Sequence, residues 1–212
     1  MLIGDSFLGL AAGPTALEAM MLDKSVPYVD ILMRRAASEK PPNVSLPDGY
    51  RFSFFKPGDE ADWARIETSV LEFDCEIDAL LYFQREFLPY LRELERRCVF
   101  IEAPDGEKVA TCTAWWGYSG VRRDPWLHWL SVKPGHQGKR LGKALVAEIV
   151  RLMTDIEGTR DFYLHTQTWS HKAIRIYQAF GFQITSEPGL ANYSNENHQK
   201  ALAVLERIYH NT

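Results

Sequence analysis

The stretch that decides the fold is Val-Lys-Pro-Gly-His-Gln-Gly-Lys-Arg-Leu-Gly-Lys-Ala-Leu-Val, at residues 132–146. A β-prone apolar run at 126–132 leads into it, and apolar residues at helical spacing run through its second half. The pattern predicts a strand, a short loop and a helix. Backbone N–H groups in the first turn of a helix lack partners within it, and the helix dipole makes that end electropositive, so the loop suits a phosphate or pyrophosphate. Lys139, Arg140 and Lys143 add positive charge there.

Two classes of phosphate loop have to be distinguished. A P-loop needs four residues between its glycines, then Lys and a hydroxyl residue. Here three residues separate Gly138 from Gly142, and Ala144 follows Lys143, so the P-loop is excluded. Residues 137–142, Gln-Gly-Lys-Arg-Leu-Gly, resemble instead the Gln/Arg-x-x-Gly-x-Gly/Ala loop of the GNAT superfamily of N-acetyltransferases, which binds the pyrophosphate of acetyl-CoA through backbone amides.

One position of the loop departs from that family pattern. Arg140 stands where the family usually has glycine. An arginine is compatible with a helical φ, from which its side chain can reach phosphate, but it is unfavourable if the position needs a positive φ. The loop therefore predicts an anion site whose backbone conformation at Arg140 decides how well the substitution fits.

Composition and charge bound the class of protein. The chain has 212 residues, 46% of them hydrophobic, which suits one domain with an appendage or two small domains. Lys plus Arg number 24 against 28 Asp plus Glu, so the net charge of -4 argues against a nucleic-acid partner. Three cysteines without paired spacing and six scattered histidines indicate reduced thiols in a cytoplasmic protein and no structural metal. No apolar run reaches the ~20 residues that span a bilayer, and no targeting segment is expected.

The chain divides into an N-terminal arm and linker at residues 1–49 and a domain at residues 50–212. Within the arm, residues 15–22 are expected to form two helical turns or to belong to a disordered tail. Residues 27–35 alternate like a short strand or extended arm, and 41–49 read as a turn-rich linker.

Within the domain, hydrophobic periodicity predicts alternating strands and helices. A proline at position 89 interrupts the second helix, so the chain there either kinks or begins a new helix. A final short strand is expected near 189–193. The other expected strands lie at 50–55, 98–103, 108–117, 126–132, 162–167 and 182–185, and the expected helices at about 59–73, 77–94, 141–157, 170–180 and 195–210.

This order of elements is that of the GNAT fold, and a second motif supports the resemblance. Residues 170–182, Ser-His-Lys-Ala-Ile-Arg-Ile-Tyr-Gln-Ala-Phe-Gly-Phe, resemble the family's Asn-x-x-Ala-x-x-x-Tyr-x-x-x-Gly-Phe segment. Ser170 replaces the usual Asn, which removes one amide contact to the cofactor but keeps a residue able to cap the helix. The resemblance covers roughly residues 50–185.

The resemblance implies an α/β (α+β) fold with a mixed, mostly antiparallel sheet and helices on both faces. In that fold the strands at 126–132 and 162–167 splay around the cofactor. More loosely, residues 125–129 and 165–173 look like those of uncharacterised bacterial GNAT proteins, which leaves the substrate undefined. The residues implied to hold acetyl-CoA are Leu130, Ser131, Val132, Gln137, Gly138, Lys139, Arg140, Leu141, Gly142, Lys143, Ser170, Ala173 and Tyr177.

The implied activity is direct transfer of an acetyl group from acetyl-CoA to a primary amine in a ternary complex. Such a reaction needs a base for the ammonium proton, a donor for the oxyanion and a proton for the departing thiolate. The resemblance supplies Tyr177 as the acid and a backbone N–H near Leu130 to Val132 as the donor. For Tyr177, the alternative is a helix residue that packs its ring on the sheet.

His128 is the residue predicted to act as the base, directly or through a water. In an unbroken alternating strand it shares a face with Trp126, Leu130 and Val132, which points it along the cleft, although a bulge would reverse this. An unperturbed imidazole titrates near pH ~6.5 and can accept a proton at pH 7. The alternative is a hydrogen-bonded core histidine. Substitutes for the role are His165, Glu67, Glu72 and Asp124.

No competing catalytic motif appears, since Gly-x-Ser-x-Gly is absent and no cysteine stands in a nucleophile motif. The expected partner is a small-molecule or peptide amine, without nucleic acid or membrane, and the sequence allows a homodimer. The alternative function is a non-catalytic acyl-CoA-binding sensor or scaffold with the same fold. Five tryptophans are expected either to floor an aromatic or cationic acceptor site or to fill the core: Trp115, Trp116, Trp126, Trp129 and Trp169.

Overall fold

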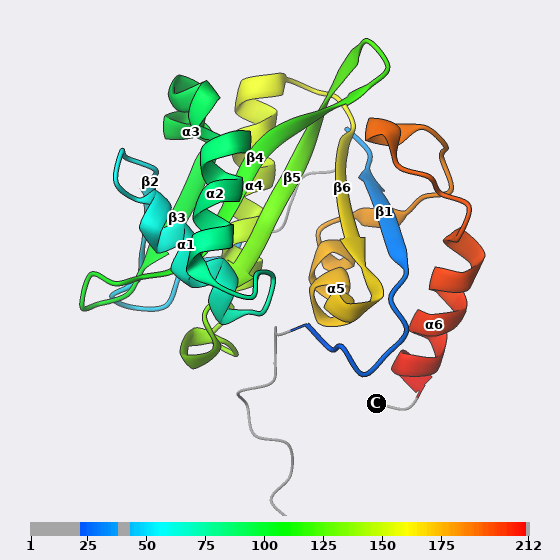
Figure 1. Ribbon diagram of the computed structural model, residues 1–212, viewed down its shortest axis with the longest axis horizontal. Coiled ribbons are helices and arrows are strands. Elements are labelled where there is room, and N and C mark those ends of the chain that lie inside the picture. The colour runs from blue at the N-terminus through cyan, green and yellow to red at the C-terminus, as the bar shows by residue number, and fades with distance from the viewer. Residues whose placement is uncertain (1–21, 38–42, 211–212) are drawn as a thin grey trace, which may run out of the picture.

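The computed structural model describes residues 22–37 and 43–210 (Figure 1). Its strands are β1 (Asp30–Arg35), β2 (Arg51–Phe54), β3 (Cys98–Glu102), β4 (Lys108–Ser119), β5 (Arg122–Val132), β6 (Phe162–Gln167) and β7 (Phe182–Ile184). Its α-helices are α1 (Glu60–Ser69), α2 (Glu76–Glu86), α3 (Leu91–Arg97), α4 (Leu141–Glu157), α5 (His171–Ala179) and α6 (His198–His210).

The described strands form one seven-stranded sheet in the order β2-β3-β4-β5-β6-β1-β7. Every neighbouring pair is antiparallel except β5 and β6, which run parallel. The predicted fold class, a mixed and mostly antiparallel sheet with helices on both faces, is confirmed.

Two apolar cores cover the two faces of the sheet. In β3, Val99 and Ile101 face the core under α4, α5 and α6, whereas Cys98 and Phe100 face the core under α1, α2 and α3. This is the period of two that a strand imposes on its side chains. Figure 1 shows α1 and α2 in front of the sheet and α4 behind it. The alternation predicted from sequence therefore decides which helices pack on which side.

The N-terminal strand β1 lies inside the sheet rather than beside it. It pairs antiparallel with β6 on one side and with β7 on the other. Its residues Ile31 and Met33 enter the α4 side core, while Leu32 packs on the opposite face. The short strand predicted at 27–35 thus exists, and it takes an interior place that the sequence did not indicate.

The seventh strand predicted near 189–193 was wrong. That segment forms a 3₁₀ turn at Leu190–Asn192, and positive φ angles at Gly189, Ala191 and Asn192 are incompatible with an extended strand. β1 is the strand that completes the sheet instead. It precedes residue 50, where the family resemblance begins, so the resemblance could not locate it.

The proline at position 89 begins a new helix rather than kinking one. α2 ends at Glu86, a 3₁₀ turn spans Leu88–Tyr90, and α3 begins at Leu91. Proline has no N–H to continue the α2 ladder, but its fixed φ suits the first turn of a helix. The last helix begins at His198, three residues later than expected. The helical turns expected at 15–22 lie outside the described residues, apart from Leu22.

Within residues 22–37 and 43–210, no helix combines the length and the apolar character needed to cross a bilayer. Over the same residues, no group of three or more His, Cys, Asp and Glu side chains is placed to hold a metal ion. Cys75, Cys98 and Cys112 are free thiols.

Candidate active site

The site begins where β5 and β6 separate. The two parallel strands pair at one position among the described residues, Trp126 with Tyr163, and then diverge, as predicted. A cavity of about 350 Å³ lies between them, lined by β5 residues 127–131, β6 residues 165–167 and the beginning and one face of α5. The divergence therefore opens the sheet at the place where the resemblance puts the cofactor.

A β-bulge in β5 sets which side chains face this cavity. His128 pairs with Thr113 and Ser131 with Thr111, so two β5 residues oppose the single residue between those threonines. Trp129 has a φ of 55°. A bulge inserts one residue and reverses the facing of those beyond it.

The bulge corrects the predicted orientation of His128. Leu130 and Val132 pack into the core under α4, whereas Trp129 packs against the aromatic core under α1 and α2. His128 remains on the face of Trp126, whose ring centroid is 6.4 Å away. His128 therefore does not share a face with Leu130 and Val132, because the inserted residue shifts the alternation between them.

His128 nevertheless lines the cavity and is half-buried. Its imidazole makes no hydrogen bond to a described residue. Burial, with a smaller contribution from nearby His165, lowers its pKa to about 4. The expectation of an unperturbed imidazole titrating near pH ~6.5 is corrected: the ring is neutral at pH 7 and holds a proton only weakly.

Tyr177 projects from α5 into the same cavity and is 6% exposed. Burial raises the pKa of its phenol well above the usual value. The phenol is therefore protonated throughout the neutral pH range. Ala173, one turn earlier on α5, and Ser170, just before it, also line the cavity.

Ser170 occupies the position before α5 that the sequence predicts for a cap, but it makes no side-chain capping hydrogen bond. It is the last residue of a 3₁₀ turn at Thr168–Ser170 and has φ and ψ of -93° and 29°, outside the extended conformation that directs a capping hydroxyl to the first turn. The predicted capping bond is thus absent, and Ser170 lines the cavity instead.

The loop before α4 is braced from within. The Gln137 side chain is buried and its Nε2 donates to the carbonyl oxygen of Val132 at 2.8 Å. Gly138 has a φ of 77° and Arg140 a φ of 65°, so two residues of the loop adopt the left-handed conformation. This is the unfavourable alternative for Arg140, because a non-glycine residue in that region costs roughly 1–2 kcal/mol.

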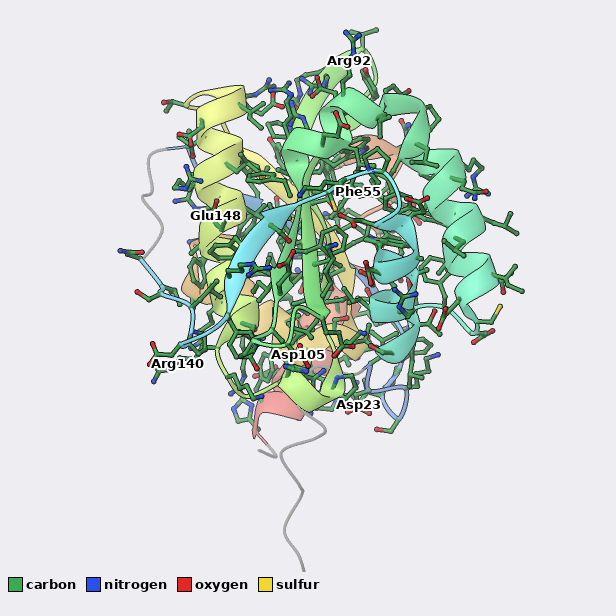
Figure 2. The ribbon with its side chains drawn as sticks, turned by 90° about the vertical axis from the view of Figure 1, so that its left-hand side faces the viewer. Asp23, Phe55, Arg92, Asp105, Arg140 and Glu148 are labelled. Carbon is green, nitrogen blue, oxygen red and sulfur yellow. The ribbon has the colours of Figure 1, made fainter. Side chains whose placement is uncertain are left out.

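The three cations of the loop are exposed around the start of α4. Lys139 Nζ lies 3.0 Å from the Tyr50 hydroxyl, which in turn lies 3.0 Å from Nδ1 of His136. Figure 2 shows Arg140 at the same end of the molecule as Asp105 and opposite Arg92. Of the residues predicted to hold acetyl-CoA, those from Gln137 to Lys143 form this loop, and Leu130, Ser131, Ser170, Ala173 and Tyr177 line the cavity.

Of the four residues named as alternatives to His128 for the general base, two line the cavity and two do not. His165 and Glu72 line the cavity, whereas Glu67 and Asp124 do not. Asp124 is buried in an ion pair with Arg122. Glu67 is fully buried behind β5, where one carboxylate oxygen accepts from Ser131 Oγ at 2.7 Å and the other has no partner among the described residues. Burial raises the pKa of Glu67 well above its usual value.

The five tryptophans do not form one cluster. Trp115 and Trp116 stack on each other with ring centroids 4.0 Å apart, and Trp126 stacks on Tyr163. Trp129 and Trp169 line the cavity. The cavity residues that sequence reasoning missed include Lys24, Tyr28, Tyr82 and Tyr193. They come from three distant segments, and no spacing in the sequence links them to each other.

Comparison with known proteins agrees with the fold. The acetyltransferase (GNAT) family matches residues 62–182, more than half of the chain. None of the curated proteins matches the chain.

Several solved structures have a similar fold. A GCN5-related N-acetyltransferase from Sphaerobacter thermophilus has a TM-score of 0.58 at 22% identity, over 76% of this chain and 49% of that one. An acetyltransferase from the GNAT family from Colwellia psychrerythraea has a TM-score of 0.56 at 11% identity, over 75% of this chain and 54% of that one. A tandem GNAT protein from the clavulanic acid biosynthesis pathway has a TM-score of 0.52 at 18% identity, over 86% of this chain and 59% of that one. This chain spans about half the length of the first of these proteins.

The positive φ at Arg140 gives a prediction about stability. Arg140→Gly and Arg140→Ala remove the same charge, but only glycine adopts the left-handed conformation without a steric cost. After allowing for the larger chain entropy of glycine, the Gly variant should have the higher free energy of unfolding by about 0.5–1 kcal/mol. Urea denaturation of both variants measures the difference. Equal stability, or a more stable Ala variant, would contradict the conformation described for the loop.

Proposed function

Because the chain belongs to the GNAT family of acetyltransferases, we propose that it transfers an acetyl group from acetyl-CoA to a primary amine, directly and in a ternary complex. The observation that carries the proposal is the cavity between β5 and β6. On its walls it places a buried phenol, Tyr177, and two proton acceptors, His128 and Glu72. An acid and a base facing one cavity are what amide formation from a thioester and an ammonium requires.

The residues before α4 fit the pyrophosphate of acetyl-CoA. The hydrogen bond from Ala144 N to the Arg140 carbonyl oxygen, 3.0 Å long, begins the helical hydrogen bonding of α4. The N–H groups before Ala144 therefore have no acceptor within the helix. Three exposed cations surround that end, and a helix dipole adds to their field. Bound acetyl-CoA supplies the acetyl group as a thioester. The loop binds and orients it.

The first task of the chain's own residues is to take the proton from the ammonium. The pKa of His128 is lowered to about 4, whereas burial raises the pKa of Glu72 above its usual value, against smaller opposing effects of Lys24 and Gln167. A stronger base takes a proton more readily, so Glu72 is the better acceptor of the two. We therefore propose that Glu72 receives the proton and that neutral His128, the base proposed from sequence, accepts a hydrogen bond beside it.

The second task is to return a proton to the sulfur that leaves. Tyr177 keeps its proton at neutral pH because burial disfavours the phenolate. Its hydroxyl makes no hydrogen bond to a described residue, so it is available to a group in the cavity. We propose that Tyr177 donates its proton to the departing thiolate as the C–S bond breaks, and that the phenolate takes up the second proton, which the newly acylated nitrogen loses. A backbone N–H of β5 near Leu130 faces the carbonyl oxygen, on the side where β6 no longer pairs.

Release of free CoA thiol tests this function. Acetyl-CoA should yield thiol with at least one member of a panel of arylalkylamines, alkylamines, polyamines, aminoglycosides and peptides. Tyr177→Phe keeps the ring and removes only the hydroxyl group that donates the proton. The kcat should therefore fall by roughly ten- to a hundredfold, with acetyl-CoA affinity nearly intact.

Tyr118→Phe is the matched control for that variant. Tyr118 is 52% exposed near the end of β4 and does not line the cavity, so loss of its hydroxyl group should leave kcat unchanged. Equal kcat in the two variants would remove Tyr177 from the reaction. Binding of acetyl-CoA without thiol release from any amine would instead support the acyl-CoA-binding module.

The acidic limb of kcat/KM distinguishes the two proposed acceptors. A base works when deprotonated, so activity through Glu72 should be lost as the pH falls through its raised pKa, while activity through His128 would persist to about pH 4. Glu72→Gln should abolish the acidic inflection and lower the rate by about a hundredfold, and His128→Gln should keep the inflection. The opposite result, measured with an amine of low pKa, would return the role to His128.

A further inference from the structure

The outer part of the cavity is walled by aromatic rings. Tyr82 and Trp129 meet edge to face with ring centroids 5.1 Å apart, and Tyr28 and Trp169 do the same at 5.0 Å. Tyr193 stacks on His165 at 4.0 Å. Burial raises the pKa of Tyr28 and of Tyr82 to about 12, so these phenols are neutral. The walls therefore offer several uncharged π faces, which attract cations.

One carboxylate, Glu72, lines this cavity among the described residues. It is half-buried on the loop after α1, and no lysine, arginine or histidine of the described residues reaches it within ion-pair distance. Its surroundings include Lys24, whose charge acts on it, and the buried carboxyl of Glu67. A desolvated carboxylate without an ion-pair partner favours the binding of a cation from outside.

The segment at residues 22–29 forms one wall of the cavity. Asp23 N donates to the carbonyl oxygen of Trp169 at 2.9 Å, and Trp169 Nε1 donates back to the carbonyl oxygen of Val26 at 2.8 Å. Val29 N donates to Thr168 Oγ1 at 3.0 Å. This segment is therefore fixed to the residues that link β6 to α5, and its side chains have defined positions at the cavity.

Lys24 is the cation that this segment brings. Its Nζ lies 5.6 Å from the centroid of the Trp169 ring, and its side chain lines the cavity together with Glu72. It makes no ion pair with a described residue, and it is exposed. An ammonium over a ring, with a carboxylate in the same cavity, is the environment that an amine substrate would need.

We propose that the outer cavity binds the ammonium of a small aryl- or alkylamine against Glu72 and the surrounding rings, and that Lys24 is an internal cation which competes for this position. The amine's apolar body lies against the aromatic walls, and its ammonium displaces the Lys24 side chain toward solvent. That this amine accepts the acetyl group rests on the proposed function. Its binding in the outer cavity does not, because binding requires no acetyl transfer.

Calorimetry with phenethylamine, 2-phenylethanol and 3-phenylpropionate tests the site in the full chain. The three probes share an aryl body and differ in charge. Phenethylamine should bind the most tightly. Lys24→Met should tighten its binding about three- to fivefold, because the competitor is gone, and Glu72→Gln should weaken it at least about tenfold. Lys56→Met, at an exposed position away from the cavity, is the matched control and should change nothing.

Two results would overturn the proposal. One is phenethylamine affinity that is equal in the Lys24→Met and Lys56→Met proteins. The other is tight binding of phenylpropionate that Lys24→Met abolishes, since Lys24 would then be an anion-binding residue. Thiol release is scored separately: binding that responds as stated without thiol release supports the site and removes the acetyltransferase function, and thiol release without any Lys24 effect does the reverse.

Discussion

The rest of the structure depends on one interruption in the hydrogen bonding of the sheet. β5 and β6 pair at Trp126 and Tyr163 and then part, so backbone groups that a sheet would satisfy are left at a cavity wall. The sheet stays intact because apolar packing bridges the gap. Val132 of β5 and Leu164 of β6 belong to one core with residues of α4 and α5. Across the gap, apolar packing holds β5 and β6 together in place of the backbone hydrogen bonds that join the other strands. The unpaired backbone groups are available to bind a ligand.

The same place concentrates the unusual electrostatics of the molecule. His128, Glu72 and Tyr177 come from a strand, a loop and a helix, and each is displaced from its ordinary pKa chiefly by burial. Desolvation acts in opposite directions on a cationic imidazole and on an acid. Burial in one place therefore produces a weakly basic histidine, a carboxylate with raised proton affinity and a phenol that keeps its proton. Their separate roles follow from the chemical type of each side chain rather than from different surroundings.

The sequence contained enough to predict the fold class, the loop between β5 and α4 and the helix of Tyr177, because each of these is encoded by residues close together in the chain. The bulge at Trp129 could not be predicted, since residues 126–130 are large and mostly apolar and fit the strand in either facing. The interior place of β1 was equally hidden, because periodicity identifies a strand but not its neighbours. The aromatic wall is assembled from Tyr28, Tyr82 and Tyr193, and such long-range convergence leaves no local pattern.

The interior position of β1 has a consequence for the order in which the molecule is assembled. Asp30 and His165, which form a hydrogen bond in the finished sheet, are 135 residues apart in the chain. On the ribosome, β1 emerges before both of its neighbours and has neither until β6 and then β7 have been made. It must wait as an unpaired strand while the residues between β1 and β6 are made, exposed to association with other chains. Residues 22–29 hydrogen-bond to the residues that link β6 to α5, so this wall of the cavity forms when β1 pairs with β6. Closure of the site is thereby tied to completion of the fold.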